Sequence, residues 1–206
     1  MFRVVTVSRE YGSGGSRIAS LLAEKLHWKL LDNALIKEIA RVAQLDPDLV
    51  AQYDERVDPW LHRISRQSLW RGAFEGVAGV GEADFFDAER MFQLSRELIL
   101  EAAEIGDCVV VGRGGQCLLQ SRTDCFHLLI YAPLAQRIER VRGRVSSVEN
   151  AEELVSERDA QRISYTRQHY QQDPNNLHLY QMAINSELGE QAVLSAVICA
   201  ITGSNQ

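Results

Sequence analysis

The sequence has very little lysine: three residues, all within the first 37, against nineteen arginines spread along the chain. Its four cysteines show no C-x-x-C spacing, so the usual signatures of zinc sites and disulfide frameworks are missing. No apolar run approaches the roughly 20 residues that a membrane-spanning helix needs. The start of the chain also lacks the charged, apolar and small-residue regions of a secretory signal. These absences predict a cytoplasmic protein with reduced thiols, no membrane partner and arginine as its main cation.

The net charge restricts the ligands further. A formal net charge of −6 argues against general nucleic-acid binding, because phosphate backbones select basic surfaces. Guanidinium groups stay charged and bind phosphate oxygens through two parallel hydrogen bonds, so we expect arginines to contact any phosphate-bearing ligand. Seven of them fall close together in the sequence: Arg137, Arg140, Arg142, Arg144, Arg158, Arg162 and Arg167.

Predicted strands and helices alternate along the chain. Apolar runs predict strands at 3–8, 28–31, 108–111, 126–131 and 177–184. Helical periodicity predicts helices at 15–26, 33–42, 88–105, 133–144, 151–170 and 189–202. Asn33 is a candidate N-cap, Pro47 and Pro59 indicate further helix starts, and 72–87 is a glycine-rich connection. This alternation, over 206 residues that are 46% hydrophobic, predicts one α/β domain with a parallel sheet covered on both faces.

A glycine-rich segment lies between the first predicted strand and the first predicted helix. Its sequence is Ser8-Arg9-Glu10-Tyr11-Gly12-Ser13-Gly14-Gly15-Ser16-Arg17. In such a turn, glycines let backbone N–H groups approach phosphate, and the helix dipole favours negative charge. The segment departs from the P-loop pattern G-x-x-x-x-G-K-[ST], because Arg9 stands at the first glycine and Gly15 at the lysine. The predicted ATP-binding residues are Gly12, Ser13, Gly14, Gly15, Ser16 and Arg17, with Ser16 at the position whose hydroxyl binds magnesium.

Two further motifs follow predicted strands. Gly112-Arg113-Gly114-Gly115 comes after the strand at 108–111, and Ala132-Pro133 comes after the strand at 126–131. Because the carboxyl ends of parallel strands share one edge of a sheet, where ligands bind, we expect both motifs to lie near the glycine-rich segment. The sequence therefore predicts a phosphate site at this edge.

Several short segments are typical of one protein family. They are Ser8-Arg9-Glu10-Tyr11-Gly12-Ser13-Gly14-Gly15, Ile18-Ala19, Leu22-Ala23-Glu24-Lys25-Leu26, Leu31-Asp32-Asn33, Val111-Gly112-Arg113-Gly114, Ala132-Pro133-Leu134 with Arg137 and Arg140, Asp159 with Arg162 and Tyr165, and Ile184-Asn185-Ser186. On these segments the chain resembles the cytidylate-kinase-like proteins, a divergent branch of the P-loop nucleoside monophosphate kinases. The resemblance covers nearly the whole chain, with the exception of about residues 55–90. The resemblance implies a single three-layer domain over 1–206. Its core would cover 1–31, 106–133 and 172–206, with an acceptor-side helical insert at about 33–90 and a lid at about 134–167.

The resemblance also implies a chemistry. ATP with Mg²⁺ would donate a phosphoryl group to a small acceptor, with CMP or dCMP as the leading acceptor, and arginines would stabilise the charge of the group in transfer. The residues that the resemblance implies for the acceptor are Asp32, Asn33, Arg113 and Asp159. The catalytic candidates are Arg17, Arg137, Arg140, Arg158 and Arg162.

The resemblance is incomplete at several positions. Gly114 replaces an aspartate that follows the acceptor-binding arginine in true cytidylate kinases, and the strand end at 130–133 lacks an acidic residue. The lid helix of those kinases carries an arginine, then an aspartate, then a catalytic arginine. One register aligns these positions with Arg158, Arg162 and Tyr165. The other aligns them with Val155, Asp159 and Arg162, and the sequence leaves both open.

Plainer roles compete with these assignments. The glycines could form an ordinary turn, Arg113 could serve as a salt-bridge partner, and many arginines of the lid alternate with glutamates as solvated pairs. The missing lysine at Gly15 and the tyrosine at Tyr131 favour a silent nucleotide-binding regulator as an alternative. The changes at Gly114 and Arg162 favour a kinase with a non-nucleotide acceptor. The segment Phe85-Phe86 with Met91-Phe92 is a candidate for packing the insert or for a homo-oligomer contact.

Overall fold

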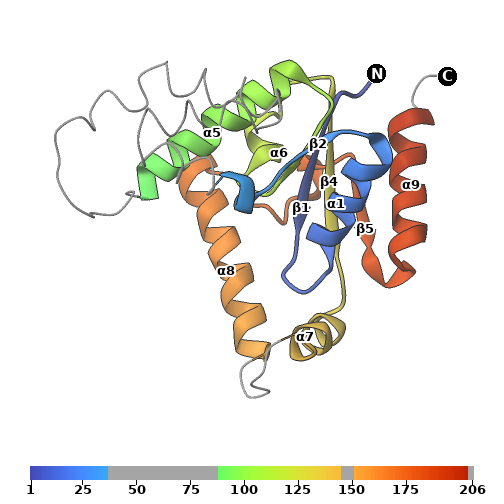
Figure 1. The fold of residues 1–206 in the computed structure, drawn as a ribbon. Coiled ribbons are helices and arrows are strands. Elements are labelled where there is room, and N and C mark those ends of the chain that lie inside the picture. Colours follow the sequence, from blue (N-terminus) through green and yellow to red (C-terminus); the bar gives the residue numbers. More distant parts are fainter. Residues whose placement is uncertain (37–87, 145–150, 204–206) are drawn as a thin grey trace, which may run out of the picture. The chain divides into compact units, whose positions relative to one another are not determined.

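The computed structural model of the chain describes residues 1–36, 88–144 and 151–203 (Figure 1). The chain forms two compact units, one of Met1–Leu30 with Asp107–Gln206 and the other of Leu31–Gly106. The predictions for 37–87, which include the helix starts at Pro47 and Pro59, the glycine-rich connection and Phe85-Phe86, lie outside the described residues. The first unit contains the glycine-rich segment and the arginines between 113 and 167.

A five-stranded parallel sheet has the strand order β2-β3-β1-β4-β5. The strands are β1 (Val4–Arg9), β2 (Lys29–Leu31), β3 (Cys108–Val111), β4 (Cys125–Tyr131) and β5 (Met182–Asn185). The central β1 pairs with β3 on one side and β4 on the other, so that Val7 is opposite both Val111 and Leu128. These strands are nearly continuous buried apolar runs, as a sheet covered on both faces requires. The predicted α/β class is confirmed.

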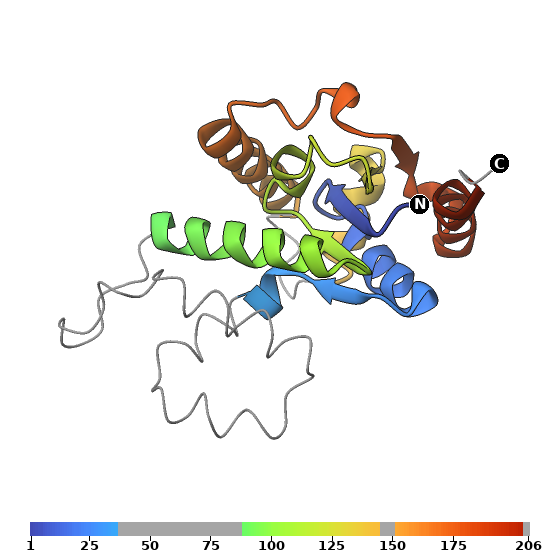
Figure 2. The same ribbon diagram turned by 90° about the horizontal axis from the view of Figure 1, so that it is seen from above.

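Helices cover both faces of this sheet in the first unit. On one face, α1 (Gly15–Leu26) and α9 (Glu190–Thr202) pack against alternate residues of the strands (Figure 2). The short α6 (Gly115–Leu118) lies on the other face, where Gly115 approaches Val110 and Thr6. Beyond the carboxyl ends of β1 and β4, α7 (Leu134–Arg142) packs against α8 (Ala151–Tyr170) (Figure 1). Among the described helices, none has the length and apolar composition to cross a membrane.

In the second unit, a helix begins after Asp32. The Asp32 carboxylate accepts a hydrogen bond from the Leu35 N–H at 2.9 Å, and its carbonyl accepts one from the Ile36 N–H at 3.1 Å. Asp32 is therefore the N-cap, and the prediction of Asn33 was wrong by one residue, since a carboxylate caps equally well. The predicted helix at 88–105 is confirmed as α5 (Ala88–Ile105), which buries an apolar stripe.

The last strand is shorter than the sequence predicted. Residues 177–184 were predicted as one strand, whereas Leu177–Leu179 form a 3-10 turn, η2, before β5 begins at Met182. The Asn176 side chain causes this difference, because its oxygen accepts a hydrogen bond from the His178 N–H at 3.1 Å and so favours a turn. A second 3-10 turn, η3 (Ser186–Leu188), follows β5. Neither η3 nor α6 was predicted, because each is too short to show periodicity.

His127 on β4 predicts a pH dependence of stability. Its Nδ1 lies 2.7 Å from the Thr6 hydroxyl, and burial lowers the pKa of the imidazole below its ordinary 6.5. The unfolded chain therefore binds this proton more readily, so the free energy of unfolding falls as the pH drops below about 6.5. In urea unfolding, we expect His127→Gln to lose less stability than the unaltered chain between about pH 7.5 and about pH 5. An equal loss in both proteins would contradict this assignment.

Candidate phosphate-binding site

The segment between β1 and α1, residues 10–14, forms a tight turn that depends on its glycines; we call residues 10–16 the phosphate loop. Gly12 and Gly14 both have φ of 80°, a left-handed conformation that side chains disfavour, and Gly14 is the N-cap of α1. A Cβ at Gly12 would lie 2.7 Å from the Arg137 carbonyl oxygen, so no side chain fits there. The buried Ser13 hydroxyl accepts a hydrogen bond from the Gly15 N–H at 3.3 Å. The loop therefore presents backbone at the start of a twelve-residue helix, an arrangement suited to anions.

Gly15 and Arg9 are in close contact at the base of the loop. A Cβ added at Gly15 would meet the Arg9 Cβ at 2.5 Å and the Arg9 Cγ at 3.1 Å. Real Cβ atoms do not approach this closely, so Gly15 cannot be replaced by the usual lysine while Arg9 keeps its position. The two departures from the P-loop pattern are thus coupled in space.

Ser16 and Arg17 occupy the first turn of α1 and are both exposed. Magnesium in kinase sites keeps several waters and uses one or two protein oxygens together with phosphates of the substrate. The exposed Ser16 hydroxyl fits such a role, and a cage of protein carboxylates is not needed. Accordingly, residues 1–36, 88–144 and 151–203 contain no cluster of three or more metal-binding side chains.

Arg137 on α7 lies under the phosphate loop, with only 9% of its side chain exposed. Its Nε donates to the Ala132 carbonyl at 3.0 Å and lies 3.3 Å from the Glu10 carboxylate. Its Nη1 donates to the Tyr11 carbonyl at 3.2 Å and pairs with the Asp159 carboxylate. The guanidinium is therefore bonded to two carboxylates and to the backbone of the loop, which fixes where the loop sits on α7.

Asp159 ties α8 to the same loop. One carboxylate oxygen accepts a hydrogen bond from the Tyr11 N–H at 2.7 Å, and the other pairs with Arg137. Apolar contacts reinforce this link, because Tyr11 packs against the buried cluster of Val141, Ala151 and Val155 between α7 and α8. The phosphate loop is thus joined to both helices by ionic and apolar contacts.

Two more arginines bond to carbonyl groups of this region. Arg140 donates through Nη1 to the Ser13 carbonyl at 3.1 Å and to the Ser186 hydroxyl at 2.9 Å. Arg162 donates to the Arg9 carbonyl at 2.9 Å, and its guanidinium lies 5.4 Å from the centre of the Tyr11 ring. Burial lowers the pKa of Arg162 from its usual range, although the guanidinium stays charged at neutral pH. Positive charge therefore surrounds the loop from α7 and from α8.

The second predicted motif lies beside the phosphate loop, at the end of β3; we call residues 112–115 the Arg113 loop. The Gly112 N–H donates to the Val7 carbonyl of β1 at 3.0 Å. Gly112, Arg113 and Gly114 have successive φ values of 75°, 54° and 68°, and the left-handed arginine among them is strained. Backbone strain of this kind concentrates at functional sites.

Residues of α8 hold the Arg113 loop. The Tyr170 hydroxyl donates to the Arg113 carbonyl at 3.0 Å, and the Arg113 guanidinium lies 5.6 Å from the centre of the Tyr165 ring. A Cβ at Gly114 would run into the Tyr170 ring, so an aspartate does not fit at this position. One helix, α8, therefore contacts both the phosphate loop and the Arg113 loop.

The comparison with known sequences decides the family. The sequence model of the cytidylate kinase-like family matches residues 4–188, which is most of the chain. The chain belongs to the cytidylate kinase-like family. Membership of a kinase-like family implies a phosphotransferase in general and a nucleotide donor, usually ATP with Mg²⁺. No curated protein matches the chain.

Solved structures similar to this cytidylate kinase-like protein support its fold. A protein from Eubacterium ventriosum is 19% identical over 98% of each chain, with a TM-score of 0.66. Shikimate kinase from Acinetobacter baumannii, solved with shikimate, is 14% identical over 100% of this chain and 96% of its own, with a TM-score of 0.50. A gluconokinase from Sinorhizobium meliloti is 11% identical over 98% and 97%, also with a TM-score of 0.50. At these identities the likeness shows a P-loop kinase fold, which was predicted.

The structure separates the two registers proposed for the lid helix of this cytidylate kinase-like chain. Asp159 and Arg162 both face the phosphate loop, and Val155 is fully buried beneath them. Arg158 is exposed and donates to Gln161 on the same helix at 3.1 Å. Asp159 and Arg162 of the second register thus lie at the site while Arg158 of the first does not, and the alignment of either register with the lid positions of cytidylate kinases stays a prediction.

The sequence reasoning missed two residues that shape the site. The Glu10 carboxylate accepts a hydrogen bond from the Ala132 N–H at 3.0 Å and contacts Arg137, which joins the phosphate loop to the end of β4. A signal existed, because Glu10 is the only acidic residue between 8 and 17. Tyr170 gave no local signal, since its partner Arg113 is 57 residues away in the chain. Asp32 and Asn33 belong to the second unit, where the Asp32 carboxylate caps a helix.

Proposed function

We propose that this chain transfers a phosphoryl group from ATP, with Mg²⁺, to a small acceptor, with CMP or dCMP as the leading acceptor. One observation carries the proposal: the phosphate loop and the Arg113 loop follow the paired parallel strands β1 and β3, and the Gly112 N–H at the start of the Arg113 loop donates to the Val7 carbonyl of β1. A donor phosphate on the first loop and an acceptor phosphate at Arg113 would then be neighbours. Phosphoryl transfer needs this positioning and compensating positive charge more than covalent work by the protein.

The residues divide into those that bind and those that position. Backbone N–H groups of the loop that are not bonded within it, at residues 12, 14 and 16, and the Arg17 side chain would bind the donor phosphates. Ser16 would contribute its hydroxyl to Mg²⁺, which would neutralise phosphate charge. Arg113 binds the phosphate of the acceptor. Arg137 and Asp159 keep the loop in place on α7 and α8.

The remaining predicted residues keep proposed roles. Arg140 and Arg162 add positive charge where the phosphoryl group passes, while each also bonds a loop carbonyl. Arg158 is exposed and would meet a ligand only at the outer side of α8. For Asp32 and Asn33, which belong to the second unit, the role at the acceptor base stays what the resemblance implies. The activity is proposed for the cytoplasm, where the redox state suits the free cysteines.

A non-nucleotide acceptor is the second candidate. The Tyr170 ring fills the space beside Gly114, so the aspartate of true cytidylate kinases has no counterpart there. The structural neighbours include kinases named for shikimate and gluconate, which shows that this fold serves other acceptors. A silent nucleotide-binding regulator is the third candidate, and Gly15 in place of the lysine is the residue that favours it.

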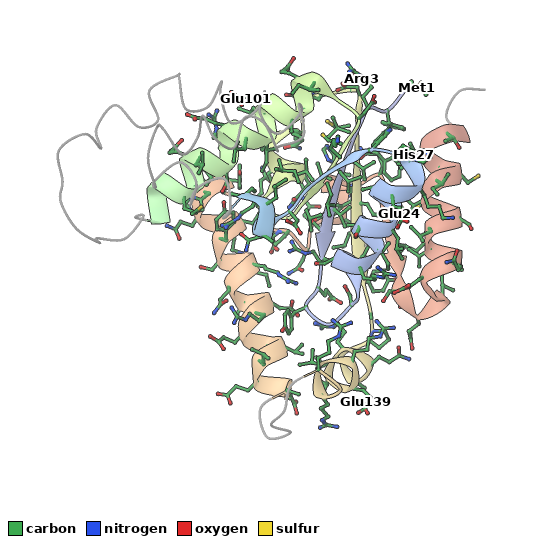
Figure 3. All side chains as sticks on the ribbon, in the orientation of Figure 1. Met1, Arg3, Glu24, His27, Glu101 and Glu139 are labelled. Atoms are coloured by element: carbon green, nitrogen blue, oxygen red, sulfur yellow. The ribbon has the colours of Figure 1, made fainter. Side chains whose placement is uncertain are left out.

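An acceptor panel tests these candidates. ADP release is measured with Mg-ATP and, separately, CMP, dCMP, UMP, AMP, GMP, shikimate and gluconate, each beside an Arg113→Ala variant. Arg142→Ala is the matched control, because Arg142 is an exposed arginine of α7 whose partner, Glu139, points away from the phosphate loop (Figure 3). We expect turnover with CMP or dCMP that is lost in Arg113→Ala and kept in Arg142→Ala. Turnover with a hydroxy acid alone would support the second candidate, and ATP binding without any turnover would support the third.

A further inference from the structure

Arg9 departs from the P-loop pattern by placing a cation at a glycine position. It stands at the end of β1, where the P-loop pattern has its first glycine, while the lysine position holds Gly15. Relative to the pattern, a glycine and a cationic residue have exchanged places. Residues 9–15 therefore keep one glycine and one cation at these two positions.

The two exchanged positions compete for the same space in the structure. The Arg9 Cβ and Cγ occupy the space into which a side chain at Gly15 would grow, at 2.5 and 3.1 Å from an added Cβ. At its far end, the Arg9 Nη1 lies against Gly112, in the place that a Cβ of residue 112 would need. The Arg9 side chain thus extends from the base of the phosphate loop to the Arg113 loop, and glycines at both 15 and 112 make room for it.

The position of Arg9 is held from its backbone. Its carbonyl accepts a hydrogen bond from Arg162 on α8 at 2.9 Å, and β1 pairs on both sides, with β3 and β4. An arginine on such a central strand end is rigidly placed at its Cα. Its guanidinium then lies against Gly112 at the start of the Arg113 loop, near which the donor and acceptor phosphates are expected to meet.

We propose that the Arg9 guanidinium replaces the missing P-loop lysine as the cation that binds the phosphoryl group between the phosphate loop and the Arg113 loop. This inference rests on the proposed function for the identity of the donor. A guanidinium offers phosphate oxygens a planar pair of donors, which a lysine ammonium does not. Arg137 is already paired with two carboxylates and bonded to the backbone of the loop, so its role is to hold the loop in place.

Binding of inorganic tripolyphosphate, measured by calorimetry on the full chain, tests the proposal without an acceptor. We expect Arg9→Gln to weaken binding at least about tenfold, because it removes a charge-assisted pair of hydrogen bonds, whereas Arg9→Lys weakens it only about threefold. Arg142→Gln, the matched control on the outer side of α7, stays within about twofold. Arg9→Gln that is folded and binds tripolyphosphate as tightly as the unaltered chain would overturn the proposal.

A reciprocal exchange gives a second, independent test. Gly15→Lys alone is expected to weaken tripolyphosphate binding at least about tenfold, because its Cβ meets that of Arg9. Adding Arg9→Gly to it rebuilds the regular P-loop pattern and is expected to bring binding back to within about threefold of the unaltered chain. If Arg9→Gln does not fold, the comparison of Gly15→Lys with the double variant tests the proposal in its place. A double variant that binds tripolyphosphate no more tightly than Gly15→Lys would contradict the proposal.

The outcomes separate this inference from the proposed function. Arg9-dependent binding of tripolyphosphate without phosphoryl transfer to any acceptor would refute the kinase and leave the role of Arg9 standing. If the unaltered chain transfers a phosphoryl group but Arg9→Gln binds tripolyphosphate as tightly as the unaltered chain, the role of Arg9 is refuted and the kinase activity is not. A chain that binds no tripolyphosphate at all overturns the inference directly.

Discussion

Arg113→Ala is expected to lower kcat/KM for phosphoryl transfer by about 100- to 1000-fold, because one preorganised cation at a charge-rich transition state is worth about 3–4 kcal/mol. The strained loop holds this guanidinium beside the Tyr165 ring, and the Tyr170 hydroxyl holds its carbonyl. Alanine at φ of 54° carries the same backbone cost as arginine, so the fold should be unaffected. The measurement is steady-state ADP release at varied acceptor concentration.

Two controls make this prediction specific. Arg113→Lys keeps the charge but not the planar pair of donors, so it should retain more activity than Arg113→Ala. Arg142→Ala should leave kcat/KM within about twofold, since its exposed pair with Glu139 at 3.6 Å lies away from the loops. A less than fivefold loss in Arg113→Ala, with its unfolding midpoint unchanged, would remove the acceptor role from this residue.

Arg137→Gln is expected to reduce the free energy of unfolding by about 2–4 kcal/mol, because it leaves the Glu10 and Asp159 carboxylates without their shared cation. Fully buried pairs cost more when broken, but 37% of the Glu10 side chain and 23% of the Asp159 side chain are exposed, and water offsets part of the loss. Urea unfolding measures the effect. Nucleotide affinity should fall as well, since the loop loses its attachment to α7.

The matched comparison again uses Arg142. Arg142→Gln should change the free energy of unfolding by less than about 0.5 kcal/mol, as exposed pairs do. Combining Arg137→Gln with Asp159→Asn should cost less than the sum of the single variants, because the two side chains share one interaction. Additive losses, or a loss below about 1 kcal/mol for Arg137→Gln alone, would show that this cluster does not hold the phosphate loop in place.

Much of the fold could be predicted from the sequence because its elements have strong local signals. The strands at β1, β3 and β4 are short buried runs, and α5 and α8 were predicted with the bounds they have. The predictions failed where a single side chain decides the backbone. The Asn176 side chain turns the chain before β5, and the Asp32 carboxylate caps the next helix in place of Asn33.

The site was predictable in its location but less so in its contacts. The strand-end rule placed the phosphate loop and the Arg113 loop at one edge, and the parallel pairing of β1 with β3, which puts Val7 opposite Val111, agrees with this placement. Sequence spacing could not show that Arg137 and Asp159 meet, since they are 22 positions apart and lie on different helices, α7 and α8. Nor could it show that Arg9 takes the space beside Gly15, because that contact depends on how the turn closes.

Side chains of α8 contact both loops of the site. Asp159 and Arg162 bond to the phosphate loop and the end of β1, while Tyr165 and Tyr170 contact the Arg113 loop. A helix with contacts to both loops couples the proposed donor and acceptor sites mechanically. Substitutions along this face of α8 should therefore affect both affinities together.

The central claim is transfer of a phosphoryl group between two ligands, and phosphorus NMR follows it directly. The unaltered chain is incubated with Mg-ATP and CMP, and the ATP γ-phosphorus signal is followed over time. The account predicts that this signal is replaced by the β-phosphorus of CDP, together with ADP, at a rate that Arg113→Ala abolishes. Replacement of the ATP γ-phosphorus signal by that of free phosphate would contradict phosphoryl transfer to an acceptor. An ATP γ-phosphorus signal that stays unchanged with every acceptor of the panel would contradict it as well.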